Sequence, residues 1–204
     1  MAAAALVVGG GVILGVGAFR HVSPPQAPLA KAGQNVAAQP KSTAGKALLL
    51  PGSIPVRLDV PRIGVHTRLL SLGLDSQGAA AVPELSQAQL ASWYNGGPSP
   101  GELGPAVLLG HVDTKSGPAV FYRLGEMRAG DEIDVTRKDG TVAVFAADSV
   151  ARYPKSGFPA EKVFGDLGYA GVRLITCGGD FDSSTGHYLD NTIVFGHLTG
   201  SRAT

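Results

Sequence analysis

The feature that most constrains the fold is a series of short apolar runs, each broken by Gly or Pro, between about Ile54 and Leu198. Runs such as "VRLDVPRIG" and "VHTRLLSLGL" alternate apolar with polar residues, a period typical of β-strands. Strands this short and this closely spaced, with only brief helical pieces between them, favour a mainly β fold. We expect a closed or nearly closed β-barrel.

Two stretches give local predictions that a structure can test. In "DEIDVTRKDGTVAVFAADSVARY" the pair Asp139-Gly140 lies between two alternating runs, which predicts a β-hairpin with its turn at this pair. In "ELSQAQLASWY", Leu85, Leu90 and Trp93 follow Pro83 at partly helical spacing, which predicts one short helix.

The N-terminal part of the chain differs from this domain in composition. Residues 1–19, "MAAAALVVGGGVILGVGAF", carry no charge and are just long enough to cross a bilayer as a helix, so we expect a transmembrane anchor. A cleaved signal peptide is the alternative, supported by the small residues around Ala30 and Ala32. Residues 20–52 are rich in Pro, Ala and Gln, which predicts a flexible linker to a folded domain over residues 53–200.

Charge and composition exclude several classes of function. The chain has 17 Lys and Arg against 16 Asp and Glu, so its net charge of +1 gives no electrostatic basis for binding nucleic acid. The single cysteine excludes an intramolecular disulfide. Neither a CxxC nor an HExxH motif is present, so the sequence gives little support for a metal site, and it implies no cofactor.

That single cysteine, Cys177, closes the strand-like run "GVRLITC" and is followed by two glycines. His111 closes another such run, "GPAVLLGH". A cysteine nucleophile needs a partner that favours its thiolate, and its acyl-thioester chemistry needs a proton donor for the leaving amine; imidazole can serve both needs near neutral pH. Cys177 and His111 are therefore the candidate catalytic pair, with a buried structural cysteine as the alternative.

Several motifs together resemble one family. "GHVDTKSGPAVFYRL", "RYPKSGFP" and "LITCGGDFDSSTGHYLDN" occur in the order found in sortases, and the chain resembles most closely their class F, the actinobacterial class E/F-type branch. The resemblance covers about Val56 to Leu198. It implies an eight-stranded β-barrel, His111 as the catalytic histidine and Cys177 as the nucleophile.

The resemblance also implies a reaction and its partners. Cys177 would attack a backbone carbonyl in a C-terminal sorting signal of the LPXTG type, carried by a secreted protein. His111 would protonate the departing amine, and a second amine, on a cell-wall precursor or a protein lysine, would resolve the thioester. The family further implies a catalytic domain outside the cell, held at the membrane by the apolar N-terminus.

One departure from the family pattern concerns an arginine on the strand after the cysteine, which steadies the oxyanion and the substrate. Between Cys177 and His197 this chain has no arginine, and Asn191 lies near the expected place. Arg173 is the nearest arginine before the cysteine; alternation puts it on the Cys177 face, roughly 13 Å away. We therefore expect Arg173 to contact substrate and Asn191 to donate to the oxyanion.

Two other functions are compatible with the sequence. A cysteine hydrolase on the same scaffold would share the acylation step and use water in place of the amine. A non-catalytic, wall-binding barrel would tolerate the loss of both Cys177 and His111.

Overall fold

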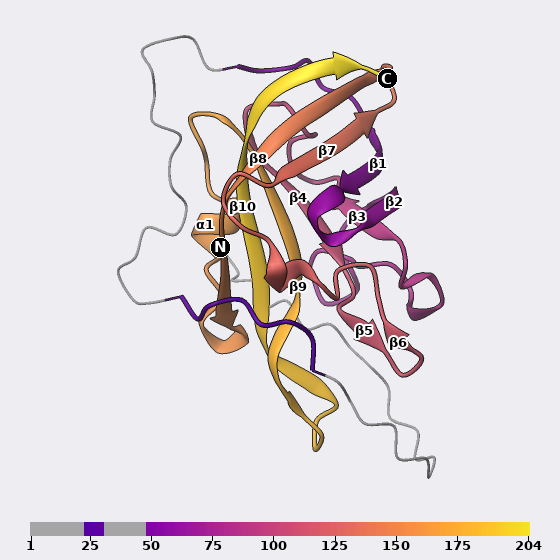
Figure 1. Ribbon diagram of the computed structural model, residues 1–204, viewed down its shortest axis with the longest axis vertical. Helices are drawn as coiled ribbons and strands as arrows, with labels where there is room; N and C mark the ends of the chain where they lie inside the picture. The colour runs from indigo at the N-terminus through magenta and orange to yellow at the C-terminus, as the bar shows by residue number, and fades with distance from the viewer. Residues whose placement is uncertain (1–22, 31–47) are drawn as a thin grey trace.

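The computed structural model describes residues 23–30 and 48–204. The fold is mainly β with short helical pieces (Figure 1). The strands are β1 (Pro55–Val60), β2 (Val65–Leu72), β3 (Ala91–Tyr94), β4 (Gly104–Gly110), β5 (Asp113–Thr114), β6 (Gly117–Pro118), β7 (Glu132–Arg137), β8 (Thr141–Pro154), β9 (Ala170–Asp182) and β10 (His187–Ala203). The helices are α1 (Ala160–Phe164) and the 3-10 turns η1 (Pro61–Ile63), η2 (Leu85–Gln87), η3 (Leu124–Glu126) and η4 (Lys155–Gly157).

Eight of these strands close into a barrel in the order β1-β2-β3-β4-β9-β10-β8-β7, which confirms the predicted eight-stranded barrel. The pairs β2–β3 and β4–β9 are parallel, and the other neighbours in the barrel are antiparallel. Strands β5 and β6 form a separate two-stranded ribbon beside it. The long strands β8, β9 and β10 extend beyond the rest of the barrel at one end (Figure 1).

The predicted hairpin is confirmed. Strands β7 and β8 pair across a turn in which Gly140 has a φ of 81°, a conformation that favours glycine. The Asp139 carboxylate accepts hydrogen bonds from the backbone N–H of Thr141 at 3.0 Å and from its hydroxyl at 2.7 Å. The turn is therefore fixed by its own residues, which is why it could be predicted from sequence.

The helix predicted over Glu84 to Tyr94 is wrong for most of its length. Only η2 is helical, and Ala91–Tyr94 form strand β3 between β2 and β4. Ala91 and Trp93 are buried in the core of the barrel. Pairing with two neighbouring strands outweighs the local preference for a helical turn, as is common for short segments.

Two hydrophobic clusters lie on the two faces of the barrel wall. The larger one fills the interior and includes Leu108, Leu174 and Val194. The second lies on the outer face of the strands β4, β9, β10 and β8, where Val163 of α1 covers it; its strand members are Val107, Leu109, Ile175, Ile193, Phe195, Ala151 and Tyr153. These four strands are thus buried on both faces, and the candidate site lies on their outer face.

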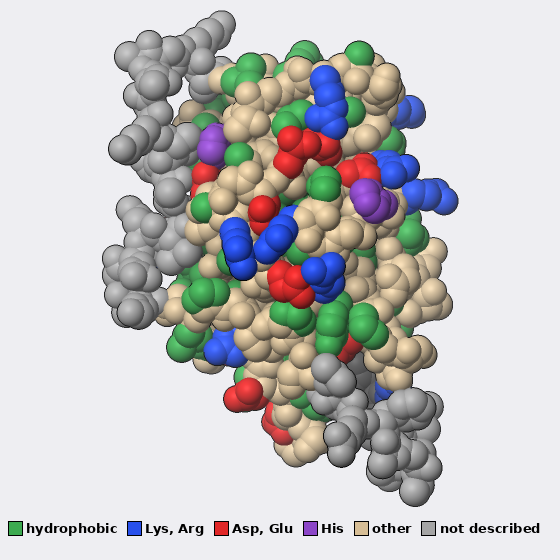
Figure 2. Space-filling model, viewed as in Figure 1, with side chains coloured by type: hydrophobic (Ala, Val, Ile, Leu, Met, Phe, Trp, Pro, Cys, Tyr) green, Lys and Arg blue, Asp and Glu red, His purple; other side chains and the backbone are tan. Residues whose placement is uncertain are grey.

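Charged groups on the molecular surface are mixed in sign. Figure 2 shows Lys and Arg side chains interspersed with Asp and Glu on one face. This agrees with the balanced net charge and gives that face no field of a single sign.

The expected linker is described in two stretches, residues 23–30 and 48–52, and both contact the barrel. In the first stretch, Ala30 N–H donates to the Arg152 carbonyl at 2.9 Å, and Arg152 N–H donates to the Pro28 carbonyl at 2.8 Å. In the second, Leu50 N–H donates to the Gly101 carbonyl at 2.8 Å. The other linker residues and the apolar residues 1–19 lie outside the described part. Within residues 23–30 and 48–204, no helix has the length and apolar character needed to cross a membrane.

Residues 23–30 depend on a close approach to Gly125 in η3. A Cβ at this position would overlap the Pro25 carbonyl oxygen and the Ala27 nitrogen. We expect Gly125→Ala to displace the segment, so that its amides exchange at least about tenfold faster in hydrogen–deuterium exchange. Gly168→Ala is the matched control, because a Cβ there meets nothing within 4 Å. Equal exchange in the two variants would show that the close approach does not hold the segment.

Candidate active site

The register of β4 and β9 brings His111 and Cys177 together. The last pair of this parallel ladder is Leu109 with Ile175; two positions further on, Cys177 lies within β9 and His111 directly follows the end of β4. Thr176 Oγ1 donates to the Gly110 carbonyl at 2.8 Å, which holds the two strand segments together at this point. Since side chains alternate along strands, His111 and Cys177 project from the same outer face, about 5 Å apart in the direction of strand pairing.

Cys177 lies within β9 and not at its end, which corrects the sequence expectation. Beyond Cys177 the strand continues, because it stays paired with β10 as far as Asp182. Strand β4, its other neighbour, ends at Gly110. The ladder between β4 and β9 therefore ends before Cys177, and the thiol is partly exposed.

His111 and Cys177 begin a row of side chains that runs across the strands. On the other side of Cys177, this row continues through β10 and β8. Asn191 pairs with Cys177 across β9 and β10, and with Tyr153 across β10 and β8. Asn191 has 0% exposure, and neither its amide nitrogen nor its amide oxygen has a hydrogen-bond partner in the structure. Buried amides are normally paired, so this one is a donor and acceptor held ready beside the thiol.

The electrostatic environment of Cys177 has opposing contributions. Burial raises the pKa of the Cys177 thiol, and the Asp113 carboxylate acts in the same direction. Lys155 of η4 acts against both through its positive charge and a hydrogen bond to the Cys177 side chain. Lys155 is thus a cation whose charge favours the thiolate form of the candidate nucleophile.

Asp113 is itself held by a second residue near the thiol. The Tyr188 hydroxyl donates to Asp113 Oδ2 at 2.5 Å. Burial and this carboxylate raise the pKa of Tyr188, so the phenol stays protonated and keeps donating. The pair links β5 to β10 at the edge of the row.

His111 is oriented by the connection between β2 and β3. Its side chain is nearly buried, at 7% exposure, and its Nε2 lies 2.6 Å from the Pro83 carbonyl oxygen. A carbonyl only accepts, so Nε2 carries the hydrogen of this bond. Nδ1 is then the nitrogen left for proton transfer, in the way that a second hydrogen bond fixes the tautomer of other catalytic histidines.

Arg173 is not brought to Cys177. Its side chain has 0% exposure, and it donates to the Lys162 carbonyl at 3.2 Å and to the Val172 carbonyl at 3.0 Å. Its guanidinium also lies over the Phe195 ring, 4.8 Å from the centroid. The substrate contact expected for Arg173 stays a prediction, and this complete burial in the second hydrophobic cluster counts against it.

The contacts of Arg173 lead instead to a prediction about stability. We expect Arg173→Ala to lower the free energy of unfolding by about 2–5 kcal/mol, since it opens a large cavity and removes the hydrogen bonds of the guanidinium to two carbonyls. The measurement is urea-induced unfolding followed by tryptophan fluorescence. An unchanged midpoint with a raised KM would restore the role in substrate binding.

For Asn191 we expect a catalytic effect. Asn191→Ala removes one neutral donor beside the thiol, so kcat should fall by about 10- to 100-fold with little change in KM, somewhat less than the loss of a full oxyanion-hole donor. Steady-state kinetics on one sorting-signal peptide provide the measurement. A raised KM with unchanged kcat would assign Asn191 to peptide binding.

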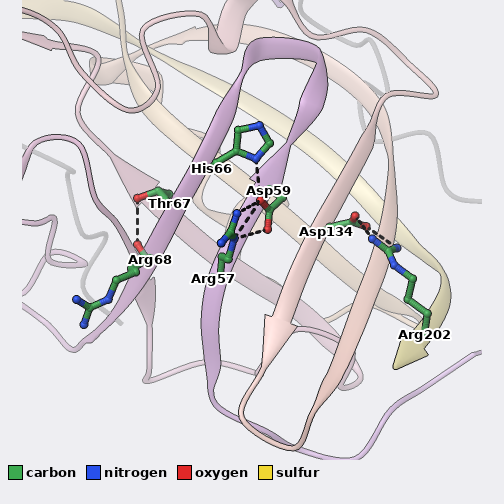
Figure 3. Close-up of polar contacts among 7 residues, drawn as sticks. All are labelled: Arg57, Asp59, His66, Thr67, Arg68, Asp134 and Arg202. Carbon is green, nitrogen blue, oxygen red and sulfur yellow. Dashed lines mark hydrogen bonds and ion pairs between the residues drawn. The ribbon is translucent and has the colours of Figure 1, made fainter. Parts of the chain in front are cut away.

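The other described histidines lie elsewhere or have other partners. His66 of β2 contacts Asp59 of β1 at 2.8 Å, beside Arg57 (Figure 3). In barrel order, these strands lie across from β9 and β10. His197 contacts Asp148 at 2.6 Å. His187 begins β10, beyond the row that contains Cys177.

Lys155, Asp113 and Tyr188 were not singled out from the sequence. Each nevertheless lies in a motif that was: Lys155 in "RYPKSGFP", Asp113 in "GHVDT" and Tyr188 in "TGHYLDN". The sequence signal that could have found them is that they are charged or hydroxyl side chains inside the motifs that resemble the family.

Comparison with known proteins supports the same fold and family. A sortase-domain family model matches residues 58–199. Among solved structures, the chain is similar to sortase A of Listeria monocytogenes, with 14% identity over 74% of this chain and 91% of that one and a TM-score of 0.56. It is also similar to the SrtA sortase of Actinomyces oris, with 21% identity over 79% of this chain and 89% of that one and a TM-score of 0.54. A sortase E variant of Streptomyces avermitilis matches with 19% identity over 76% of this chain and 93% of that one, at a TM-score of 0.51. No curated protein matches the chain.

Proposed function

The chain belongs to the sortase family of cysteine transpeptidases, and on this premise we propose that it is a membrane-anchored sortase of the class F branch. It acts on secreted proteins with an LPXTG-like C-terminal sorting signal and joins them to a cell-wall amine or to a protein lysine. The observation that supports this best is the placement of His111 and Cys177 on one face of adjacent parallel strands.

The geometry suggests how the residues share the reaction. The Cys177 thiolate attacks the scissile carbonyl carbon and forms a C–S bond, while negative charge develops on the carbonyl oxygen. Asn191, the cross-strand neighbour of Cys177, offers an amide N–H to that oxygen. As the C–N bond breaks, protonated His111 gives its proton to the departing amine, which leaves a thioester.

The second half of the reaction regenerates the enzyme. Neutral His111 accepts a proton from the incoming amine as that amine attacks the thioester carbonyl. The C–S bond breaks, the new amide is released and the thiolate returns. Two acyl transfers thus replace one difficult amide exchange.

The proposed arrangement of the chain follows from its composition. Residues 1–19 are the membrane anchor, residues 20–52 the linker, and residues 53–200 the catalytic domain on the outer side of the membrane. Because the family consists of enzymes, the non-catalytic wall-binding barrel is not carried further.

The test is mass spectrometry of the full-length chain after incubation with a library of sorting-signal peptides. We expect an acyl adduct on Cys177 and, when an amine such as oligoglycine is added, a ligated product. Hydrolysis products alone, with every amine tested, would favour the cysteine hydrolase. No adduct from any LPXTG-like peptide would contradict the proposed substrate class.

A further inference from the structure

Lys155 occupies a defined position relative to the catalytic row. It follows β8 directly, two residues after Tyr153, and Tyr153 pairs with Asn191, which pairs with Cys177. Tyr153 therefore lies about two strand spacings, roughly 10 Å, from Cys177, and Lys155 starts two residues further along, roughly 12 Å from Cys177. The flexible four-carbon stem of lysine and the Cys177 side chain together span most of this gap. The positive charge of Lys155 and a side-chain hydrogen bond from it act on the Cys177 thiol and lower its pKa.

The other cations near this row have different partners. Arg152 lies on the opposite face of β8, where its Nε is 3.2 Å from Asp190 Oδ2. Arg173 is fixed by backbone carbonyls and by the Phe195 ring. Strand β10 has no arginine between His187 and His197. Among the described residues of this region, Lys155 is the cation whose charge lowers the pKa of the Cys177 thiol.

We propose that Lys155 is a further catalytic residue, whose ammonium group holds the Cys177 thiolate and supplies, from the end of β8, the positive charge that the part of β10 beside Cys177 lacks. A partly buried thiol next to a carboxylate resists ionisation, so a contacting cation is needed to keep a useful fraction of thiolate. This role rests on the proposed function, in which Cys177 is the nucleophile.

The groups that face Cys177 come from four elements. They are Lys155 of η4, Asp113 of β5, Tyr188 of β10 and His111 after β4. The Asp113 carboxylate opposes the thiolate, while Tyr188 keeps its proton because its pKa is raised by burial and by Asp113. Removing the ammonium group therefore leaves burial and Asp113, which both favour the protonated thiol, without the Lys155 charge that opposes them.

The test measures the thiol itself and not turnover. Cys177 is the single cysteine of the chain, so iodoacetamide alkylation of the full-length protein reports on it alone. We expect Lys155→Met to move the midpoint of the alkylation rate against pH upward by about one unit, as loss of an adjacent opposite charge does. At a pH below the midpoint, the rate then falls about tenfold. Lys155→Arg, which keeps the charge, should stay within about threefold of wild type.

Lys138→Met is the matched control. This variant removes one lysine charge that lies before β8, at the opposite end of the 14-residue strand from Lys155. It should leave the alkylation curve unchanged. Lys155→Gln provides a second neutral variant if Lys155→Met proves unstable. Superimposable curves for wild type and either folded neutral variant would overturn the proposal. If wild type shows no transpeptidation but the alkylation curve of the Lys155 variant is shifted, the result counts against the proposed function and still supports the effect of Lys155 on Cys177.

Discussion

Cys177→Ala is expected to abolish transpeptidation while leaving the fold intact. In the proposed mechanism the Cys177 thiolate forms the covalent bond to the acyl group, so turnover should fall by about 10⁴-fold or more without it. The side chain is partly exposed, and only one small group is removed. The free energy of unfolding should therefore change by less than the ~1–3 kcal/mol typical of a lost core contact.

This prediction separates a nucleophile from a structural cysteine. Peptide ligation and thermal unfolding are measured on the same protein sample, with Cys177→Ser as the isosteric comparison. Transpeptidation at the wild-type rate in Cys177→Ala would show that the cysteine is not the nucleophile. Lost activity together with a large drop in melting temperature would indicate a role in packing.

His111→Ala is expected to slow acylation by about 10²- to 10⁴-fold, the range typical of a lost proton donor. The breaking C–N bond would then have to release an unprotonated amine. The measurement is the single-turnover rate of acyl-enzyme formation with a sorting-signal peptide. The variant also loses the bond to the Pro83 carbonyl, so its melting temperature is recorded in parallel.

His66→Ala is the matched control for this experiment. His66 is exposed on β2 and paired with Asp59 in the cluster drawn in Figure 3, away from the Cys177 row. The His66→Ala variant should form the acyl-enzyme at the wild-type rate. A less than tenfold effect of His111→Ala would place the general acid elsewhere, and His187 is the next residue to replace.

Local sequence determined the parts of this protein that depend on neighbouring residues. The alternating runs specified strands, and the Asp139-Gly140 pair specified the hairpin because its turn is made by its own side chain and glycine. The motifs around Cys177 and His111 indicated the sortase family, which the family model confirms. Local pattern failed for Ala91–Tyr94, whose strand pairs only with segments distant in sequence.

The tertiary structure alone decided how the site is built. The row His111, Cys177, Asn191 and Tyr153 exists because β4, β9, β10 and β8 pair in one register, and no local pattern encodes the register of β4 with β9. The same pairing buries Arg173, which alternation alone had placed on the substrate face, and brings the charge of Lys155 near enough to lower the pKa of the Cys177 thiol. Alternation fixes the face on which a side chain lies, but only the packing of the other elements over that face decides whether it meets substrate, solvent or core.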